Sequence, residues 1–199
     1  NIGLRTMVNP LIDEIFYLLL RQSTWKVHTL ASALGETNYL KQLDEDPQKD
    51  LFKRNFLIMN GLYQLQAQLA PTQRLEIASL HIELIDTCPT DRPEKDDPLR
   101  AYYLDWQNYD TSRDVIDALL DQFWQRFSTH NRFCLTQVSA EQLYPIIQHW
   151  QLPADYSYRE LQKRWRQLAL KYHPDRQGSA TKFKKIRQEY EQLKANCSH

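Results

Sequence analysis

The 199-residue chain has little of what marks several protein classes. It holds only four glycines and shows no strict repeat, which excludes collagen-like and solenoid architectures. Its longest apolar run, residues 15–20, is far shorter than the roughly 20 residues that a membrane span needs. No charged segment followed by an apolar stretch and a small-residue cleavage site opens the chain, so we expect no signal peptide. With 42% hydrophobic and 25% charged residues, the composition is that of a globular protein.

Cysteine is also scarce. The three cysteines, Cys88, Cys134 and Cys197, are scattered and never form a CxxC pair. An odd number without paired spacing argues against a disulfide framework or a zinc knuckle. It is typical of a reducing compartment, so we expect a cytoplasmic location.

The chain has no net charge, with 25 basic and 25 acidic residues, but the charges are unevenly placed. Residues 158–199 hold 11 basic and four acidic side chains and sum to +7, so residues 1–157 sum to −7. A basic end on an acidic body fits a nucleic acid, an anionic surface or an acidic protein partner. Charge alone does not choose among them.

Helix signals dominate the first seventy residues. A capping residue followed by proline marks a helix start, and glycine or proline marks a helix end. The longest predicted helix has an apolar face so broad that it must be buried on several sides. The predicted segments are a helix from Asn9-Pro10 to Leu20, a helix capped by Thr24 and ended by Gly35, and a central helix from Asp46-Pro47 to Pro71 whose buried stripe includes Leu51 and Phe52.

Strand signals follow. Residues 75–85 alternate in polarity and predict a single strand, and the proline-rich residues 87–98 predict a surface loop. Residues 99–109 fit either a second hairpin arm or a helix, and another helix is capped by Asp110 or Ser112. Three helices followed by a strand pair is the order of a winged helix. The predicted fold class is therefore mainly α, with a winged-helix-like domain over residues 1–135. Such a fold does not by itself indicate nucleic-acid binding, and an acidic domain repels phosphates.

The carboxy-terminal residues predict a helical hairpin. A short helical face around Leu143 and Trp150 places Pro145 in its first turn or at a kink. Ser157 and Glu160 form a capping-box pattern, so a helix begins at Tyr158. It ends near Tyr172, because the next residue precedes a proline. A further amphipathic helix begins near residue 180, and the two helices should pack antiparallel with His173-Pro174-Asp175 between them.

This hairpin resembles the J domain of DnaJ-type co-chaperones, which carries a His-Pro-Asp signature between its helices II and III. The resemblance covers residues 139–199. The earlier part of the chain resembles the amino-terminal domain of bacterial DnaJ-related proteins through DLFKRNFLIMNGLYQL and LRAYYLDW, and this domain has no known activity to carry over. The matching J-domain positions are Leu168, Ala169, Lys171, Tyr172, His173, Pro174, Asp175, Phe183, Ile186, Tyr190 and Leu193.

The resemblance implies a co-chaperone that docks on a DnaK-type chaperone and stimulates its ATPase, with an unknown client or adaptor at the amino-terminal domain. Helical geometry separately places Arg159, Lys163, Arg166 and Leu170 opposite the buried stripe of the helix from Tyr158. We expect no catalytic residue, cofactor, metal or membrane contact, and nucleic acid as the rival partner rather than the favoured one. The predicted partner-binding residues are His173, Pro174, Asp175, Arg159, Lys163, Arg166, Leu170 and Lys171.

Three positions depart from the usual J-domain pattern. Gln167 stands where a second basic residue is common, Trp165 replaces a tyrosine or phenylalanine, and Glu189 replaces an alanine. Helix IV and the Gly/Phe-rich and zinc-binding regions of general DnaJ proteins are also missing from the sequence. Delivery of clients by those modules is therefore not expected.

Other functions were weighed against this one. His173 and Asp175 suit a catalytic dyad or metal ligands, but no further ligand lies at metal-binding spacing near them and no nucleophile motif accompanies them. No Walker A or dinucleotide motif is present. The remaining rival is a nucleic-acid-binding winged-helix protein with a basic carboxy-terminal module. The isolated histidines, expected to be structural or solvated, are His28, His81, His130 and His149.

Overall fold

The structure, a computed structural model, describes residues 8–86, 97–132 and 138–197. The predicted loop at 87–98 lies outside the described residues except for its last two positions, as do Cys88 and Cys134. The chain forms two compact units, residues 1–122 and 123–199.

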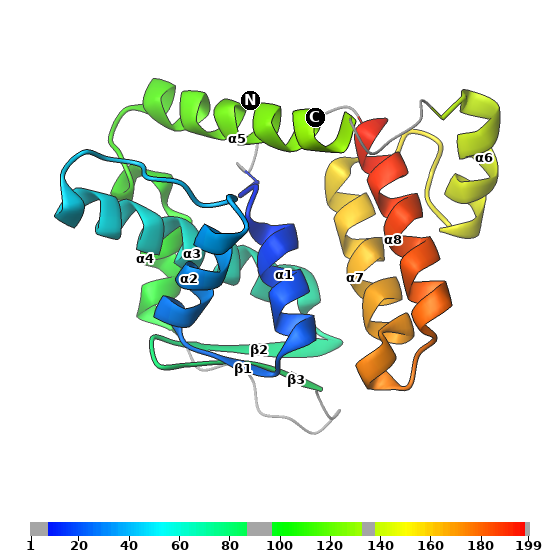
Figure 1. The fold of residues 1–199 in the computed structure, drawn as a ribbon, viewed down its shortest axis with the longest axis horizontal. Coiled ribbons are helices and arrows are strands. Elements are labelled where there is room, and N and C mark those ends of the chain that lie inside the picture. The colour runs from blue at the N-terminus through cyan, green and yellow to red at the C-terminus, as the bar shows by residue number, and fades with distance from the viewer. Residues whose placement is uncertain (1–7, 87–96, 133–137, 198–199) are drawn as a thin grey trace. The chain divides into compact units, whose positions relative to one another are not determined.

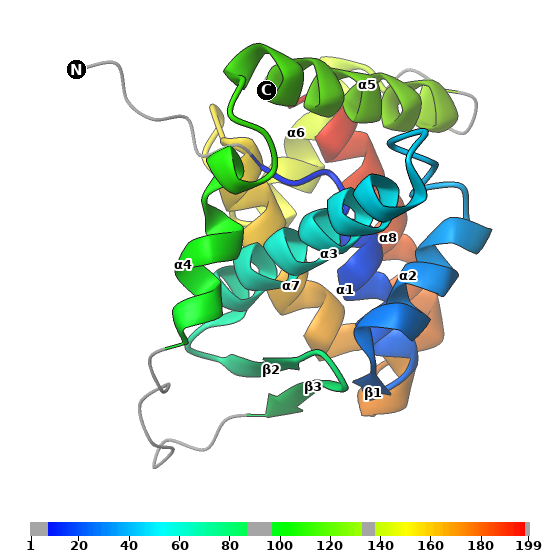
Figure 2. The same ribbon diagram turned by 90° about the vertical axis from the view of Figure 1, so that its left-hand side faces the viewer.

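The amino-terminal unit is a small helical domain with a three-stranded antiparallel sheet of strand order β1-β3-β2. Helices α1, α2 and α3 lie on one side of this sheet (Figures 1 and 2). The order of helices and strands along the chain is that of a winged helix, which confirms the predicted fold class. Its elements are α1 (Ile12–Arg21), β1 (Thr24–Trp25), α2 (Val27–Glu36), α3 (Pro47–Leu69), β2 (Gln73–Ala78), β3 (His81–Asp86), α4 (Pro98–Leu104), the short 3-10 helix η1 (Trp106–Asn108) and α5 (Arg113–Arg132), which crosses the boundary between the units.

The central helix α3 begins where the sequence predicts. The Asp46 side chain accepts hydrogen bonds from the backbone N–H groups of Gln48 (2.8 Å) and Lys49 (3.3 Å), which satisfies two donors at the helix start. From Phe56 onward the apolar face of α3 is buried, but Leu51 is 70% exposed and Phe52 is 44% exposed. The predicted burial of these two residues is wrong, because periodicity marks a face and not how far the neighbouring elements extend along it.

Strand β1 was not predicted. Thr24 and Trp25 pair with Glu83 and Ile82 of β3, so Thr24 does not cap a helix. Two residues are too few to show a period, and their strand conformation depends on a partner almost sixty residues later. Helix α2 begins at Val27, and Gly35 lies within it rather than ending it.

Helix α1 also begins later than predicted, at Ile12. The buried Asn9 still bonds to the backbone at the start of the helix, as a capping residue does. Its Oδ1 accepts from the Leu11 N–H at 2.9 Å, while its Nδ2 donates to the Leu57 carbonyl of α3 at 2.7 Å. Asn9 therefore joins the start of α1 to the central helix.

The predicted single strand at residues 75–85 is two strands, β2 and β3. They form a hairpin in which Ala78 pairs with His81, and Leu80 lies at the turn with 70% exposure. Apolar and polar residues continue to alternate through the two-residue turn, so the pattern does not reveal where the first strand ends. Residues 98–104 form helix α4, which resolves the ambiguous segment in favour of a helix.

The carboxy-terminal unit contains the predicted helical hairpin. Helices α7 and α8 lie side by side and antiparallel, and α6 packs against α8 (Figure 1). Pro145 lies within α6, beyond its first turn. The elements of this unit are α6 (Ala140–His149), α7 (Tyr158–Tyr172), the 3-10 helix η2 (Pro174–Arg176) and α8 (Ala180–Ala195). In the part of the chain that the structure describes, no helix has the length and apolar character that crossing a membrane requires.

Candidate functional site

The His-Pro-Asp turn is closed by hydrogen bonds to His173. Pro174 is the first residue of η2, where its fixed φ suits the helix and its missing N–H costs nothing. The His173 carbonyl accepts from the N–H groups of both Arg176 and Gly178, each at 3.0 Å. The His173 Nδ1 accepts from the Asp175 N–H at 3.3 Å. The histidine thus shapes the turn with its backbone and its ring.

The side chains of the turn point in opposite senses. His173 is 6% exposed, and its ring lies edge-on to the ring of Phe183 with centroids 5.0 Å apart. The Asp175 side chain is 73% exposed. Only Asp175 is therefore exposed at the tip of the turn. His173 is buried because Phe183, the first residue of the apolar face of α8, covers the imidazole.

Burial also sets the charge of His173. Loss of solvation lowers its pKa, the nearby Asp175 carboxylate opposes this shift, and Arg176 adds to it. The neutral imidazole is favoured. A neutral ring with a free electron pair on Nδ1 is the form that accepts the Asp175 N–H.

A row of aromatic rings supports the turn from inside the unit. The rings of Trp165 and Tyr190 stack with centroids 4.7 Å apart, and the ring of Trp150 also stacks with that of Tyr190, at 6.3 Å. Trp165 lies 6.1 Å from Phe183, which contacts His173. The row therefore connects the end of α6 to the His-Pro-Asp turn. The tryptophan at position 165, unusual for the resembled pattern, is one of its stacked members.

Glu189 has a clear role in this core. Its Oε2 accepts a buried hydrogen bond of 2.8 Å from the indole Nε1 of Trp150. Its other oxygen lies 3.9 Å from Lys185 Nζ. Because a buried indole N–H needs an acceptor, the departure at Glu189 is explained by Trp150, which lies 39 residues earlier.

The start of α7 has the predicted capping box. The Ser157 Oγ accepts from the Glu160 N–H, and the Ser157 N–H donates to the Glu160 carboxylate at 2.8 Å. These hydrogen bonds lower the pKa of Glu160. The register of the whole helix follows from this start, and with it the positions of its basic side chains.

Basic side chains occupy the solvent-exposed surface of α7. Arg159 and Lys163 are exposed, as the helical geometry predicts, and Lys171 is exposed as well. The ring of Tyr172 lies between two lysines, with Lys171 Nζ at 5.2 Å and Lys182 Nζ at 5.8 Å from its centroid. Positive charge therefore continues from α7 to the first turn of α8 beside the His-Pro-Asp turn.

Arg166 departs from the predicted exposed face. It is only 1% exposed, and Gln162, one turn earlier, is also 1% exposed. Leu170 is half-buried instead of exposed. The prediction assumed that α7 has one buried stripe. The helix buries a second row next to that stripe, which a helical wheel drawn for one partner does not show.

Gln167 takes part in a hydrogen-bond network that joins α7 to the end of α6. Arg164 donates from Nε to the Trp150 carbonyl at 2.8 Å, and from Nη1 to the Gln167 Oε1 at 3.0 Å. A lysine or arginine at position 167 has no acceptor to offer Arg164. The missing positive charge thus fits the contact that Arg164 makes.

Gly178 was missed by the sequence analysis. A Cβ at this position collides with the backbone carbonyl of Tyr172 and lies 2.7 Å from the His173 carbonyl oxygen. Gln177, just before it, has a left-handed backbone with φ of 63°. The sequence signal is the glycine between the His-Pro-Asp residues and the next helix cap, where a tight return of the chain demands a small residue.

One further cluster of polar groups lies on the β2–β3 hairpin. His81 Nε2 is 2.9 Å from a Glu83 oxygen and 4.0 Å from a Glu76 oxygen, so His81 is not isolated as predicted. The hairpin turn brings these side chains together. Glu76 is also paired with Arg74 at 3.1 Å, and the cluster is open to solvent.

Comparison with protein families covers both parts of the chain. The family model described as DNA-J related protein matches residues 9–127, and that of the DnaJ domain matches residues 148–197. No curated protein and no solved structure matches the chain. DnaJ domains belong to co-chaperones of the DnaK type of chaperone and not to a family of catalytic enzymes. The family match covers more than half of the chain, which therefore belongs to the DNA-J related proteins and carries a DnaJ domain at its carboxy-terminal end.

Proposed function

We propose that this chain docks on a DnaK-type chaperone through its DnaJ domain and stimulates ATP hydrolysis by that partner. The observation that carries the proposal is the His173-Pro174-Asp175 turn. The row of aromatic rings that ends at Phe183 packs against its histidine, and its aspartate presents an exposed carboxylate. A rigid turn pays little conformational entropy on binding. Contacts that favour the partner's hydrolysis-competent state over its resting state would raise its rate of ATP hydrolysis.

The proposed contact surface combines the turn with the basic side of α7. Arg159, Lys163 and Lys171 are exposed, and half-buried Leu170 lies among them. Such charges steer encounter with an acidic partner, while the turn supplies specific contacts. Arg166 is left out of this surface because it is buried.

The direct test measures ATP turnover by a purified DnaK-type chaperone with and without the full chain. Wild-type protein should accelerate turnover, and Asp175→Asn should abolish this effect. Leu80→Ser, a change at an exposed position of the other unit, is the matched control and should stimulate normally. Lack of stimulation by folded wild-type protein contradicts the proposal.

The rival proposal, nucleic-acid binding by the winged-helix unit, is tested by titrating duplex DNA at several salt concentrations. Phosphate contacts make binding fall steeply with salt. We expect no binding by residues 1–135 at physiological salt, since they hold 14 basic and 19 acidic side chains and sum to −5. Sub-micromolar, salt-dependent binding would make nucleic acid the better partner.

We also propose that residues 1–135 and 139–199 fold independently and act in the cytoplasm. The first fragment includes all of α5, and the chain passes from one structural unit to the other within this helix, after Gln122. Each fragment should melt cooperatively by itself. The scattered cysteines, of which Cys197 is a buried free thiol with a raised pKa, favour a reducing compartment.

A further inference from the structure

A groove follows the outer edge of strand β2 in the amino-terminal unit. It is a pocket of about 670 Å³ between β2 and the first turn of α4. Its walls include residues 74–79 without interruption, together with Gln66, Asp97 and Leu99. Successive residues of a strand point to opposite faces of the sheet. A pocket lined by all of them therefore lies along the strand's edge and not over one face.

This edge has no partner strand among the residues that the structure describes. The strand order β1-β3-β2 places β2 at the border of the sheet. Leu75 pairs with Leu84 of β3, yet its carbonyl accepts a hydrogen bond of 2.8 Å from Gln66 Nε2 of α3. That carbonyl therefore points away from β3, into the groove.

The alternation of an antiparallel ladder extends this result to Ile77. Residues two apart on a strand direct their backbone N–H and C=O to the same side. Ile77 therefore presents its backbone groups to the groove, as Leu75 does. An edge of this kind is a template for another extended chain.

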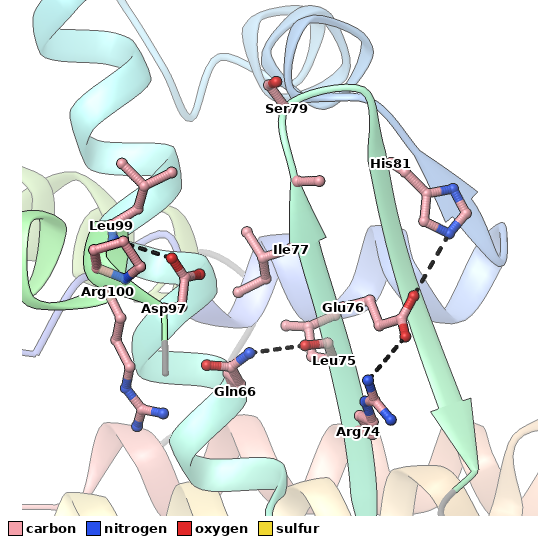
Figure 3. Close-up of a pocket in the computed structure, with 12 residues that line it drawn as sticks. Gln66, Arg74, Leu75, Glu76, Ile77, Ser79, His81, Asp97, Leu99 and Arg100 are labelled. Carbon is pink, nitrogen blue, oxygen red and sulfur yellow. Dashed lines mark hydrogen bonds and ion pairs between the residues drawn. The ribbon is translucent and has the colours of Figure 1, made fainter. Parts of the chain in front are cut away.

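The side chains around the edge indicate what such a chain carries. Ile77 is directed from β2 toward the side on which Leu99 and Asp97 lie, as Figure 3 shows. Leu99 is 53% exposed, so an apolar side chain faces this space from α4. An extended segment with apolar residues at alternate positions matches this lining.

The carboxylates of the groove, which Arg100 and His81 also line, have partners within the unit. Asp97 already accepts from the Tyr63 hydroxyl at 2.6 Å and from the Leu99 N–H at 3.0 Å. Glu76 is paired with Arg74 at 3.1 Å. These carboxylates are therefore already engaged, while Ile77 and Leu99 offer a bound segment apolar contacts.

We propose that the outer edge of β2, at Ile77 and its neighbours, binds an extended, apolar polypeptide segment as a fourth strand of the sheet. Strand β2 has six residues, so the edge spans about 20 Å and pairs with a segment of similar length. The occupant is an extended stretch of another protein with apolar side chains at alternate positions. This site is separate from the His-Pro-Asp turn, and the proposal does not depend on the proposed co-chaperone activity.

The test measures fluorescence anisotropy of a labelled peptide, Lys-Val-Thr-Val-Thr-Val-Thr-Lys, titrated with the full chain. A second peptide has the same side chains but carries N-methyl groups on the amides of both its valines and its threonines, which removes the backbone donors from both edges of the segment. We expect the parent peptide to bind and the methylated peptide to bind at least about tenfold more weakly. Equal binding of the two, or no binding of the parent peptide, overturns the proposal.

Protein variants locate the site. Ile77→Pro removes an N–H that faces the groove and not β3, which an edge strand tolerates, and it should weaken binding about tenfold. Leu99→Ser should also weaken binding, whereas Leu80→Ser, at an exposed leucine outside the groove, should not. If Ile77→Pro does not melt cooperatively, the Leu99→Ser comparison and the methylated peptide still decide. Unchanged affinity for Leu99→Ser contradicts the assignment.

Two outcomes separate this proposal from others. A concentration-dependent dimer in sedimentation experiments that Ile77→Pro abolishes would assign the edge to a second copy of the chain and overturn the proposed occupant. Stimulation of the DnaK-type ATPase should be normal for Leu99→Ser. Failure of the wild-type chain in that assay would refute the co-chaperone function without affecting peptide binding.

Discussion

The imidazole ring of His173 lies edge-on to the phenyl ring of Phe183, with centroids 5.0 Å apart and an angle of 81° between the rings. A residue of the His-Pro-Asp turn is therefore also part of the core between α7 and α8. Substitutions in this turn can therefore affect two different properties. One is the stability of the unit, to which the buried His173 contributes, and the other is the set of groups that the turn offers to a partner.

His173→Gln should abolish ATPase stimulation and should also lower the free energy of unfolding by about 1 kcal/mol, because a buried ring contact is lost. Asp175→Asn should abolish stimulation with no change in unfolding, since its side chain is 73% exposed. Urea denaturation of the two variants beside ATPase assays gives both quantities. Equal stability of the two variants would show that the ring contact contributes nothing.

The stability contributed by His173 should depend on pH. The pKa of His173 is lowered from its ordinary value of 6.5 in the folded chain, chiefly by burial. Between the folded and the ordinary pKa the unfolded chain binds more protons, so the contribution is complete above about pH 6.5 and is lost as pH falls through the folded pKa.

The measurement is the difference in free energy of unfolding between wild type and His173→Gln, taken at pH 7.5 and at pH 5. It should be larger at pH 7.5. Carboxylates such as Glu160 titrate in both proteins, so their effect cancels. A difference that is constant or grows toward acid pH contradicts the buried neutral imidazole.

Gly178→Ala should destabilise the carboxy-terminal unit by about 2–3 kcal/mol, because the added methyl group meets the Tyr172 backbone and not a movable side chain. Gly35→Ala is the matched control. Its added Cβ lies 3.5 Å from the nearest heavy atom, Arg54 Nη2, within helix α2. It should be neutral or stabilise by up to about 1 kcal/mol. Thermal melts compare the two, and a neutral Gly178→Ala would show that the turn adapts freely.

The helical hairpin of α7 and α8 was predictable because its sequence signals are local. The capping residues Ser157 and Glu160 and the apolar spacing of α8 each act within a few turns of their own helix. Strand β1 depends on pairing with Glu83 and Ile82 far along the chain, which no local pattern contains. The same limit explains Trp150 and Glu189, whose hydrogen bond joins two helices.

For the candidate site, the sequence predicted the turn and the exposed charges at Arg159 and Lys163. It did not predict the burial of His173 and Arg166. A helical wheel assigns faces from one helix alone, whereas burial depends on every element packed against it. Exposure of a motif residue is therefore the property that needed a three-dimensional structure.

Glu189→Ala, which restores the residue usual in J domains, should destabilise the unit by about 1–3 kcal/mol by leaving the buried Trp150 N–H without its acceptor. Glu189→Gln keeps a carbonyl oxygen in place and should cost much less. Chemical denaturation compares the two variants with wild type. If alanine is tolerated as well as glutamine, the indole hydrogen bond is not a source of stability.

Charge and apolar contact on α7 should affect different rates of association with an ATP-loaded DnaK-type partner. Lys163→Glu should slow association and weaken its dependence on salt, because an exposed charge acts through steering. Leu170→Ala should instead speed dissociation, by about fivefold if the contact contributes about 1 kcal/mol. Lys184→Glu on α8 makes the same change in net charge away from α7. Surface plasmon resonance separates the two rates.

If Lys163→Glu and Lys184→Glu slow association equally, net charge and not the surface of α7 governs encounter. If neither α7 variant changes the kinetics, the partner binds elsewhere on the DnaJ domain.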